Sequence, residues 1–210
     1  MTAVPATPRA AVFVDGQNLF HSVRAAFGYP FPNYDIAALA DAVCRPLGWP
    51  VTSIGFYTGL PDEIEQPDWN RFWAGKLGVM GRQGVKVFAR PLRYRDRAVI
   101  LPDGSPVVVR TGEEKGIDVR IALDVISGAH RRAFDVAVIY SQDQDLAEVA
   151  DEIRVVAREQ NRWIKVASAF PAGPSARSSR GIDKTDWIPI ARSTYDLCLD
   201  RRDYRSARPG

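Results

Sequence analysis

Short apolar runs alternate with amphipathic segments along most of the chain. Residues 10–14 form a continuous apolar run that stops at Asp15, which is typical of a buried parallel strand followed by a loop. Similar runs occur further along, at residues 52–57, 85–89, 136–140 and 163–169. Between them lie segments with helical spacing, at residues 18–27, 35–47, 69–82, 117–128 and 145–159. This alternation predicts an α/β fold, a three-layer α/β/α sandwich with a mostly parallel central sheet of about five strands.

The pattern changes in two places. Residues 93–110 contain two β-rich arms around Pro102, Asp103 and Gly104, which predicts a β-hairpin inserted into the domain. We therefore expect a leader at 1–9, a domain at 10–170, and a loop and tail at 171–210 that dock on the same domain. The loop is rich in Ser, Gly, Pro and Arg, and we expect it to be mobile and to fold over a site or its substrate.

Composition narrows the class of protein. The 210 residues are 46% hydrophobic and 25% charged, which indicates a globular chain rather than a disordered one. A net charge of +3 gives no strong overall field, so local basic patches matter more. Two cysteines are too few for a disulfide framework, and no apolar run approaches the roughly 18 residues of a membrane span. We expect a cytoplasmic protein without a membrane partner.

Acidic side chains follow two of the expected strands. Asp15 ends the first run, and the run at 136–140 leads into Ser141, Asp143 and Asp145. Ligands of open parallel sheets bind at the carboxyl ends of strands, so these side chains would converge if the two strands are neighbours. Asp118 lies in the first turn of the helix expected from residue 117 and would face the same edge.

Clustered carboxylates need a compensating cation. They repel one another and raise one another's pKa values unless a positive charge lies among them. Mg²⁺ or Mn²⁺ prefers oxygen ligands and keeps several waters, so a few Asp residues suffice. A zinc site is disfavoured because His21 and His130 are the only histidines. Asp124 lies in a helix that is apolar almost all round, so its carboxylate also requires a partner.

Each of these residues also has a purely structural interpretation. Asp15 could cap the following helix, although Asn18 is better placed for that task. Asp143 could serve only to begin a helix, where a negative charge suits the helix dipole, and the same holds for Asp145 and Asp118. Asp124 could be held by hydrogen bonds alone. The sequence leaves these alternatives open.

Three motifs resemble those of the NYN domain, a branch of the PIN-like metal-dependent nucleases. They are Val-Asp-Gly-Gln-Asn-Leu at 14–19, Lys-Gly-Ile-Asp-Val at 115–119 with Asp124 following, and Ser-Gln-Asp-Gln-Asp-Leu at 141–146. The order and spacing are similar to the family's, and the resemblance covers roughly residues 10–170. One such motif alone would mean little, whereas the three together are specific.

The resemblance implies hydrolysis of RNA phosphodiester bonds with a divalent metal, Mg²⁺ or Mn²⁺. It implies that Asp15, Asp118 and Asp143 are the catalytic residues and bind the metal, with Asp124 and Asp145 as further candidate ligands. Other residues would lie in the metal's outer shell or contact phosphate, namely Asn18, Lys115 and Ser141. Four arginines are candidates for contacting the RNA backbone, namely Arg93, Arg95, Arg177 and Arg180.

Other functions remain as alternatives. A catalytically weak NYN-like module could bind RNA or a protein partner and regulate it. A haloacid dehalogenase-type phosphatase would need a second Asp two residues after the first, where this chain has Gln17. A Rossmann nucleotide-binding domain would need a Gly-x-Gly-x-x-Gly turn after the first strand, and that turn is missing. Whether the chain forms a homodimer is left open.

Overall fold

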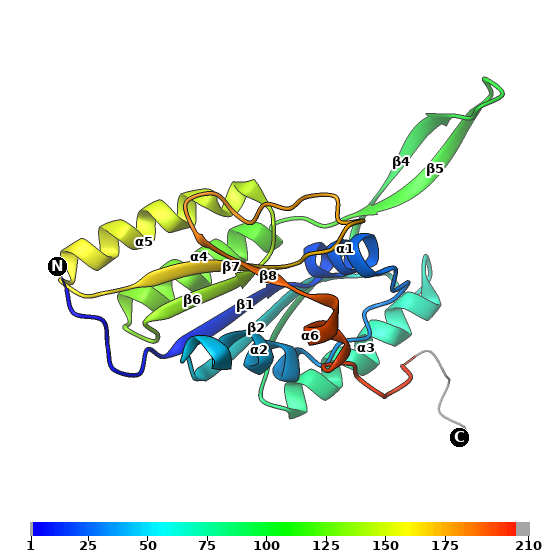
Figure 1. The fold of residues 1–210 in the computed structure, drawn as a ribbon. Coiled ribbons are helices and arrows are strands. Elements are labelled where there is room, and N and C mark those ends of the chain that lie inside the picture. The colour runs from blue at the N-terminus through cyan, green and yellow to red at the C-terminus, as the bar shows by residue number, and fades with distance from the viewer. Residues whose placement is uncertain (1, 205–210) are drawn as a thin grey trace.

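The computed structural model describes residues 2–204 and forms a three-layer α/β/α sandwich with a projecting hairpin (Figure 1). In the described residues the central sheet has six strands, all parallel, in the order β3-β2-β1-β6-β7-β8. Its strands are β1 (Ala10–Asp15), β2 (Val51–Leu60), β3 (Lys86–Pro91), β6 (Val136–Tyr140), β7 (Lys165–Pro171) and β8 (Asp186–Ile190). The helices are α1 (Gly16–Phe27), α2 (Ile36–Cys44), α3 (Pro67–Arg82), α4 (Ile117–His130), α5 (Ala147–Glu159) and α6 (Arg192–Asp196), with short 3-10 helices η1 (Arg45–Leu47) and η2 (Gln144–Leu146).

Strand β1 divides the core into two halves. Side chains alternate across a strand, so Val12 and Val14 point to one face and Ala11 and Phe13 to the other. The first face packs against α1, α2 and α3, and the second packs against α4 and α5. Every residue of β1 is buried, as a strand covered by helices on both faces requires. The predicted fold class is confirmed.

The chain order reverses at β1. From β1 the chain runs outward through β2 and β3, and it then returns to place β6 on the other side of β1. The expected neighbouring strands at 10–14 and 136–140 are therefore paired, from Ala10 opposite Val136 to Val14 opposite Tyr140. Because all six strands are parallel, their carboxyl ends share one edge of the sheet, and a reversal of chain order is the place on such an edge where ligands of open parallel sheets bind.

The sheet has one strand more than the sequence predicted. Residues 186–190, expected only to dock as part of the tail, pair in parallel with β7 as strand β8. The segment was missed because Pro189 interrupts its apolar pattern. Proline lacks a backbone N–H and is tolerated on an edge strand, which is the position of β8. Beyond β8, Leu199 forms a β-bridge with Tyr34; residues 205–210 of the predicted tail lie outside the described residues.

The predicted hairpin projects from the carboxyl edge of the sheet (Figure 1). Strands β4 (Arg93–Ile100) and β5 (Pro106–Glu113) pair antiparallel from Arg93 opposite Glu113 to Ile100 opposite Pro106. The hairpin is three residues longer than the predicted 93–110. It returns the chain directly to the start of α4, so the base of the hairpin lies at the edge that carries the acidic motifs.

The start of α1 also differs from the sequence prediction. The helix begins at Gly16 rather than Asn18, and Asp15 is its N-cap.

Among the described residues, no helix combines the length and the apolar character that a membrane span requires.

Candidate active site

Asp15 lies at the point where β1 becomes α1. Its carboxylate accepts a hydrogen bond of 2.9 Å from the Asn18 backbone N–H, which is the N-cap bond of α1. The Ser141 hydroxyl, which follows β6, donates to the other oxygen at 3.4 Å. The residue is only 4% exposed. The first acidic motif is thus held in contact with the third.

The loop after β6 turns Asp143 toward the same edge. The Asp143 backbone N–H donates to the Ser141 hydroxyl at 3.1 Å, and its carboxylate caps η2 by accepting from the Asp145 N–H at 3.0 Å. The Asn18 side-chain oxygen accepts from the Gln142 N–H at 3.0 Å. These bonds fix the third motif against the start of α1.

Asp118 lies in the first turn of α4, as predicted. The residue before the helix, Gly116, has a φ of 73°, a left-handed conformation that suits glycine, and it gives no side-chain cap. Burial raises the pKa of Asp118, and the neighbouring charges of Asp143 and Asp145 raise it further.

Glu114 is a fourth acid at this edge, and the sequence interpretation missed it. Its carboxylate accepts a hydrogen bond from the backbone N–H of Gly59 at the end of β2. A side chain at residue 59 would prevent this contact, because a Cβ there would lie 2.8 Å from the Glu114 Oε2 and 2.3 Å from the Leu92 Cδ2. The only signal in the sequence is its place directly before the Lys115–Asp118 motif.

The four acids act on one another electrostatically. Burial raises the pKa of Asp15 to about 7, an effect that the Asn18 N–H opposes and the charges of Asp118 and Asp143 reinforce. Burial likewise raises the pKa of Glu114 to about 7, and Asp15 and Asp118 add to the shift. At neutral pH Asp15 and Glu114 hold protons for part of the time, mainly because burial disfavours their charged forms and also because nearby carboxylates repel them.

The chemistry of this donor set fits a hard divalent cation. All of its ligating atoms are oxygens, and the charges that repel one another are those that a cation would compensate. As the side chains are placed, no three His, Cys, Asp or Glu residues within residues 2–204 form a group that could hold a metal ion. Direct coordination by all of the acids would therefore require side-chain movement or bridging waters.

Comparison with known proteins identifies the family. The sequence profile of the NYN domain matches residues 9–180, which is most of the chain. The chain belongs to the NYN domain family. NYN domains are part of the PIN-like nuclease superfamily, whose members typically use divalent metals.

One solved structure supports the fold of this NYN domain. It is a crystal structure of a protein of unknown function from Vibrio parahaemolyticus, 21% identical in sequence, with a TM-score of 0.55. The similarity covers 90% of this chain and 96% of that chain. No curated protein matches the chain.

Asp124 of the NYN domain has partners outside the acidic group. Its carboxylate accepts one hydrogen bond from the Tyr57 hydroxyl and one from the Arg120 guanidinium, each at 2.9 Å. It lies nearly two turns beyond Asp118 on α4, away from the carboxyl edge of the sheet. These contacts favour its structural interpretation. Asp145 is exposed, and its backbone N–H belongs to the cap of η2.

Three of the predicted basic residues pair with acids outside the group of four. Lys115 Nζ lies 3.9 Å from Glu113 Oε2 at the base of the hairpin. Arg95 Nε lies 3.8 Å from the same carboxylate, and Arg93 is exposed beside it. On the other side of the site, the Arg180 guanidinium pairs with Asp183 at 2.9 Å. The cations thus form the rim of the site rather than neutralising its centre.

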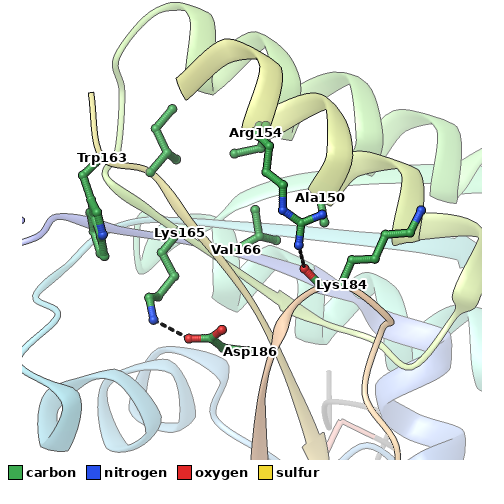
Figure 2. Close-up of a pocket in the computed structure, with 9 residues that line it drawn as sticks. Ala150, Arg154, Trp163, Lys165, Val166, Lys184 and Asp186 are labelled. Atoms are coloured by element: carbon green, nitrogen blue, oxygen red, sulfur yellow. Dashed lines mark hydrogen bonds and ion pairs between the residues drawn. The ribbon is translucent and has the colours of Figure 1, made fainter. Parts of the chain in front are cut away.

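A hollow elsewhere in the NYN domain has its charges already paired. It lies between α5 and the amino ends of β7 and β8 and measures about 170 Å³. In Figure 2, Arg154 points to the Lys184 carbonyl oxygen, at 2.6 Å, and Lys165 forms an ion pair with Asp186. These charged groups satisfy one another, so this hollow is a weaker candidate than the acidic edge.

Proposed function

We propose that this NYN domain is a divalent-metal-dependent endoribonuclease. The observation that carries the proposal is the group of four acids at the chain reversal, two of which have pKa values near 7 because they are buried and repel one another. A structural ion pair would put a cation among such acids, whereas here the cations lie at the rim. Such an arrangement suits an external cation and a polyanionic substrate.

We assign the metal to Asp15, Asp118 and Asp143, with water completing its coordination. Mg²⁺ retains waters when it binds to few carboxylates, so this assignment is compatible with acids that are not yet in direct ligating positions. Glu114 joins the three predicted residues as a candidate fourth ligand or as an acceptor for a water bound to the metal.

The residues around the acids hold the acidic side chains in position. When bound, a divalent cation would activate water and neutralise charge on the nonbridging phosphate oxygens. Ser141 and Asn18 hold Asp15 and the β6 loop in register through the bonds of 3.4 Å and 3.0 Å described above. We assign Lys115 to the scissile phosphate and the arginines at the rim to the RNA backbone.

Cleavage of fluorescently labelled single-stranded RNA in Mn²⁺ or Mg²⁺ tests this function. The variant Asp143→Asn should cleave at least about a hundredfold more slowly, because the loss of a ligand weakens an interaction worth several kcal/mol in the transition state. Asp41→Asn is the matched control, since Asp41 is a partly exposed acid on α2 whose ion-pair partner among the described residues is Arg45. Equal cleavage by wild type and Asp143→Asn would refute the assignment.

The main alternative is a weakly catalytic module that binds RNA. This alternative predicts that the wild-type protein binds RNA in Mn²⁺ and leaves the RNA intact.

We place the activity in the cytoplasm, in keeping with two free, buried cysteines among the described residues.

A further inference from the structure

A basic hollow lies beside the acidic edge. It measures about 400 Å³ and is formed between the outer side of α1 and the loop that follows β7. It is lined by His21, Arg24, Ala25, Ser175 and Arg177. The loop is packed against the helix at its start, where a Cβ on Gly173 would lie 3.1 Å from the Ala26 carbonyl oxygen.

The titratable side chains that line this hollow are all basic, and the two arginines carry its charge. Burial lowers the pKa of His21, and the charges of Arg177 and Arg24 lower it further. Among the described residues neither arginine has an ion-pair partner, in contrast to Arg95, Arg110 and Arg180. Like charges gathered without a counter-charge favour an anionic occupant, just as the neighbouring acids favour a cation.

One side chain links the acidic loop to the two elements that form the hollow. Gln142 precedes Asp143, and its backbone N–H donates to Asn18. The Ser22 hydroxyl donates to the Gln142 side-chain oxygen at 3.0 Å, and the side-chain amide donates to the Ser178 carbonyl oxygen at 3.2 Å. Gln142 therefore joins α1, the acidic loop and the loop after β7.

The position along α1 sets the spacing between the two sites. His21 follows Asp15 by six residues, which corresponds to about 9 Å along a helix axis. A single RNA strand that crosses the acidic site can therefore bring a second phosphate to the hollow.

We propose that His21, Arg24 and Arg177 form a phosphate-binding pocket that holds the RNA strand at a second phosphate beside the one being cut. This inference rests on the proposed nuclease function, because that function supplies the RNA. The pocket recognises a phosphate group, and the phosphate can come from an internal nucleotide or from a 5′ end. The arginines suit this role since a guanidinium donates two parallel hydrogen bonds to phosphate oxygens.

Binding of single-stranded RNA without metal tests the pocket. Two fluorescent oligonucleotides of one sequence, one with a 5′-phosphate and one with a 5′-hydroxyl, are titrated in EDTA and followed by anisotropy. The double variant Arg24→Gln/Arg177→Gln should bind at least one of them about tenfold more weakly, because it cannot form the charge-assisted hydrogen bonds. The slope of log affinity against log salt should fall by about 0.7 for each phosphate that the variant no longer neutralises.

The matched control is Arg82→Gln/Arg158→Gln. These two arginines are exposed, lie in the last turns of α3 and α5, and are not ion-paired among the described residues, so this variant removes the same charge. Thermal unfolding should show that both variants are folded. Weaker binding of both RNAs indicates an internal phosphate, and weaker binding of the 5′-phosphorylated RNA alone indicates a terminal one.

Equal affinities of the two double variants for both RNAs would overturn the pocket. The result is independent of catalysis because EDTA prevents cleavage in every sample. If the wild-type protein binds RNA through the pocket and never cleaves it, the nuclease function is refuted and the pocket stands. If the wild-type protein cleaves RNA and the two double variants bind RNA equally, the pocket is refuted and the acidic site stands.

Discussion

At the scale of single residues, Asp15 combines a structural and a chemical role. Its carboxylate caps α1, and burial, reinforced by the charges of nearby acids, raises its pKa to about 7. Asparagine is nearly the same size and is an equally good N-cap, so substitution removes the charge and keeps the cap. The carboxylate therefore opposes the stability of the metal-free fold, as is common in functional sites.

Asp15→Asn should make the metal-free protein more stable and inactive. A carboxyl whose pKa is raised on folding stabilises the fold below its unfolded pKa, and this contribution is lost as pH rises from about 4 through about 7. The gain on substitution should thus be larger at pH 8 than at pH 5. We expect the thermal midpoint at pH 8 to rise by about 2–4 °C for each kcal/mol of unfolding free energy that the substitution adds. A lower midpoint at pH 8, measured by calorimetry in EDTA, would contradict the burial argument.

Glu114 gives a second test at this scale through Gly59. Gly59→Ala places a methyl group against the Glu114 carboxylate and Leu92, so the acid should be displaced from the edge. We expect a loss of stability of about 1–3 kcal/mol from overpacking, together with slower RNA cleavage. Gly81→Ala is the control, since no atom lies within 4 Å of a Cβ there. Unchanged cleavage by folded Gly59→Ala would remove Glu114 from the site.

At the scale of elements, the periodicity of apolar residues predicted the helices and strands that leave a local pattern in the sequence. The buried strands and amphipathic helices were recovered because burial on two faces, or on one, leaves a direct signature in the sequence. Strand β8 was missed because Pro189 interrupts its apolar pattern. The strand forms nevertheless, because it pairs with β7 at the edge of the sheet, where proline is tolerated. Glu114 was missed because its burial depends on Gly59, 55 residues earlier, a contact that no local pattern encodes. Asp15 and Asp143 were predicted to share an edge because each follows a buried strand, and Asp118 because it lies in the first turn of a helix expected to begin at that edge.

The hairpin is the element whose removal should separate folding from substrate binding. Its outer part is exposed, with Ile100 and Val108 each more than 60% exposed, and it adds nothing to the two cores of the sheet. Replacing residues 95–111 by a two-residue Asn-Gly turn should therefore change the thermal midpoint little. It should weaken RNA binding, because the replacement removes Arg95 and neighbouring cations. A collapse of stability, or full RNA affinity in the anisotropy assay, would contradict this role.

At the scale of the whole molecule, parallel topology converts distant sequence positions into one charged edge. Asp15 and Asp143 are 128 positions apart and share this edge only because β6 lies beside β1.

A ligand that binds only the folded state stabilises it, by about 2.7 kcal/mol at a hundred times its Kd. Mn²⁺ should therefore raise the thermal midpoint, more at pH 8 than at pH 6, because protons compete for the acids. Asp143→Asn should lose most of this shift and Asp41→Asn should keep it; equal shifts in both would place the metal elsewhere.

The most direct measurement is anomalous scattering from crystals of the protein soaked in Mn²⁺. The four acids should surround a manganese peak at the carboxyl edge between β1 and β6, with ligands from Asp15, Asp118 and Asp143. No peak at that edge under conditions in which the protein cleaves RNA, or a peak bound by other residues, would contradict a metal-dependent site built from these acids.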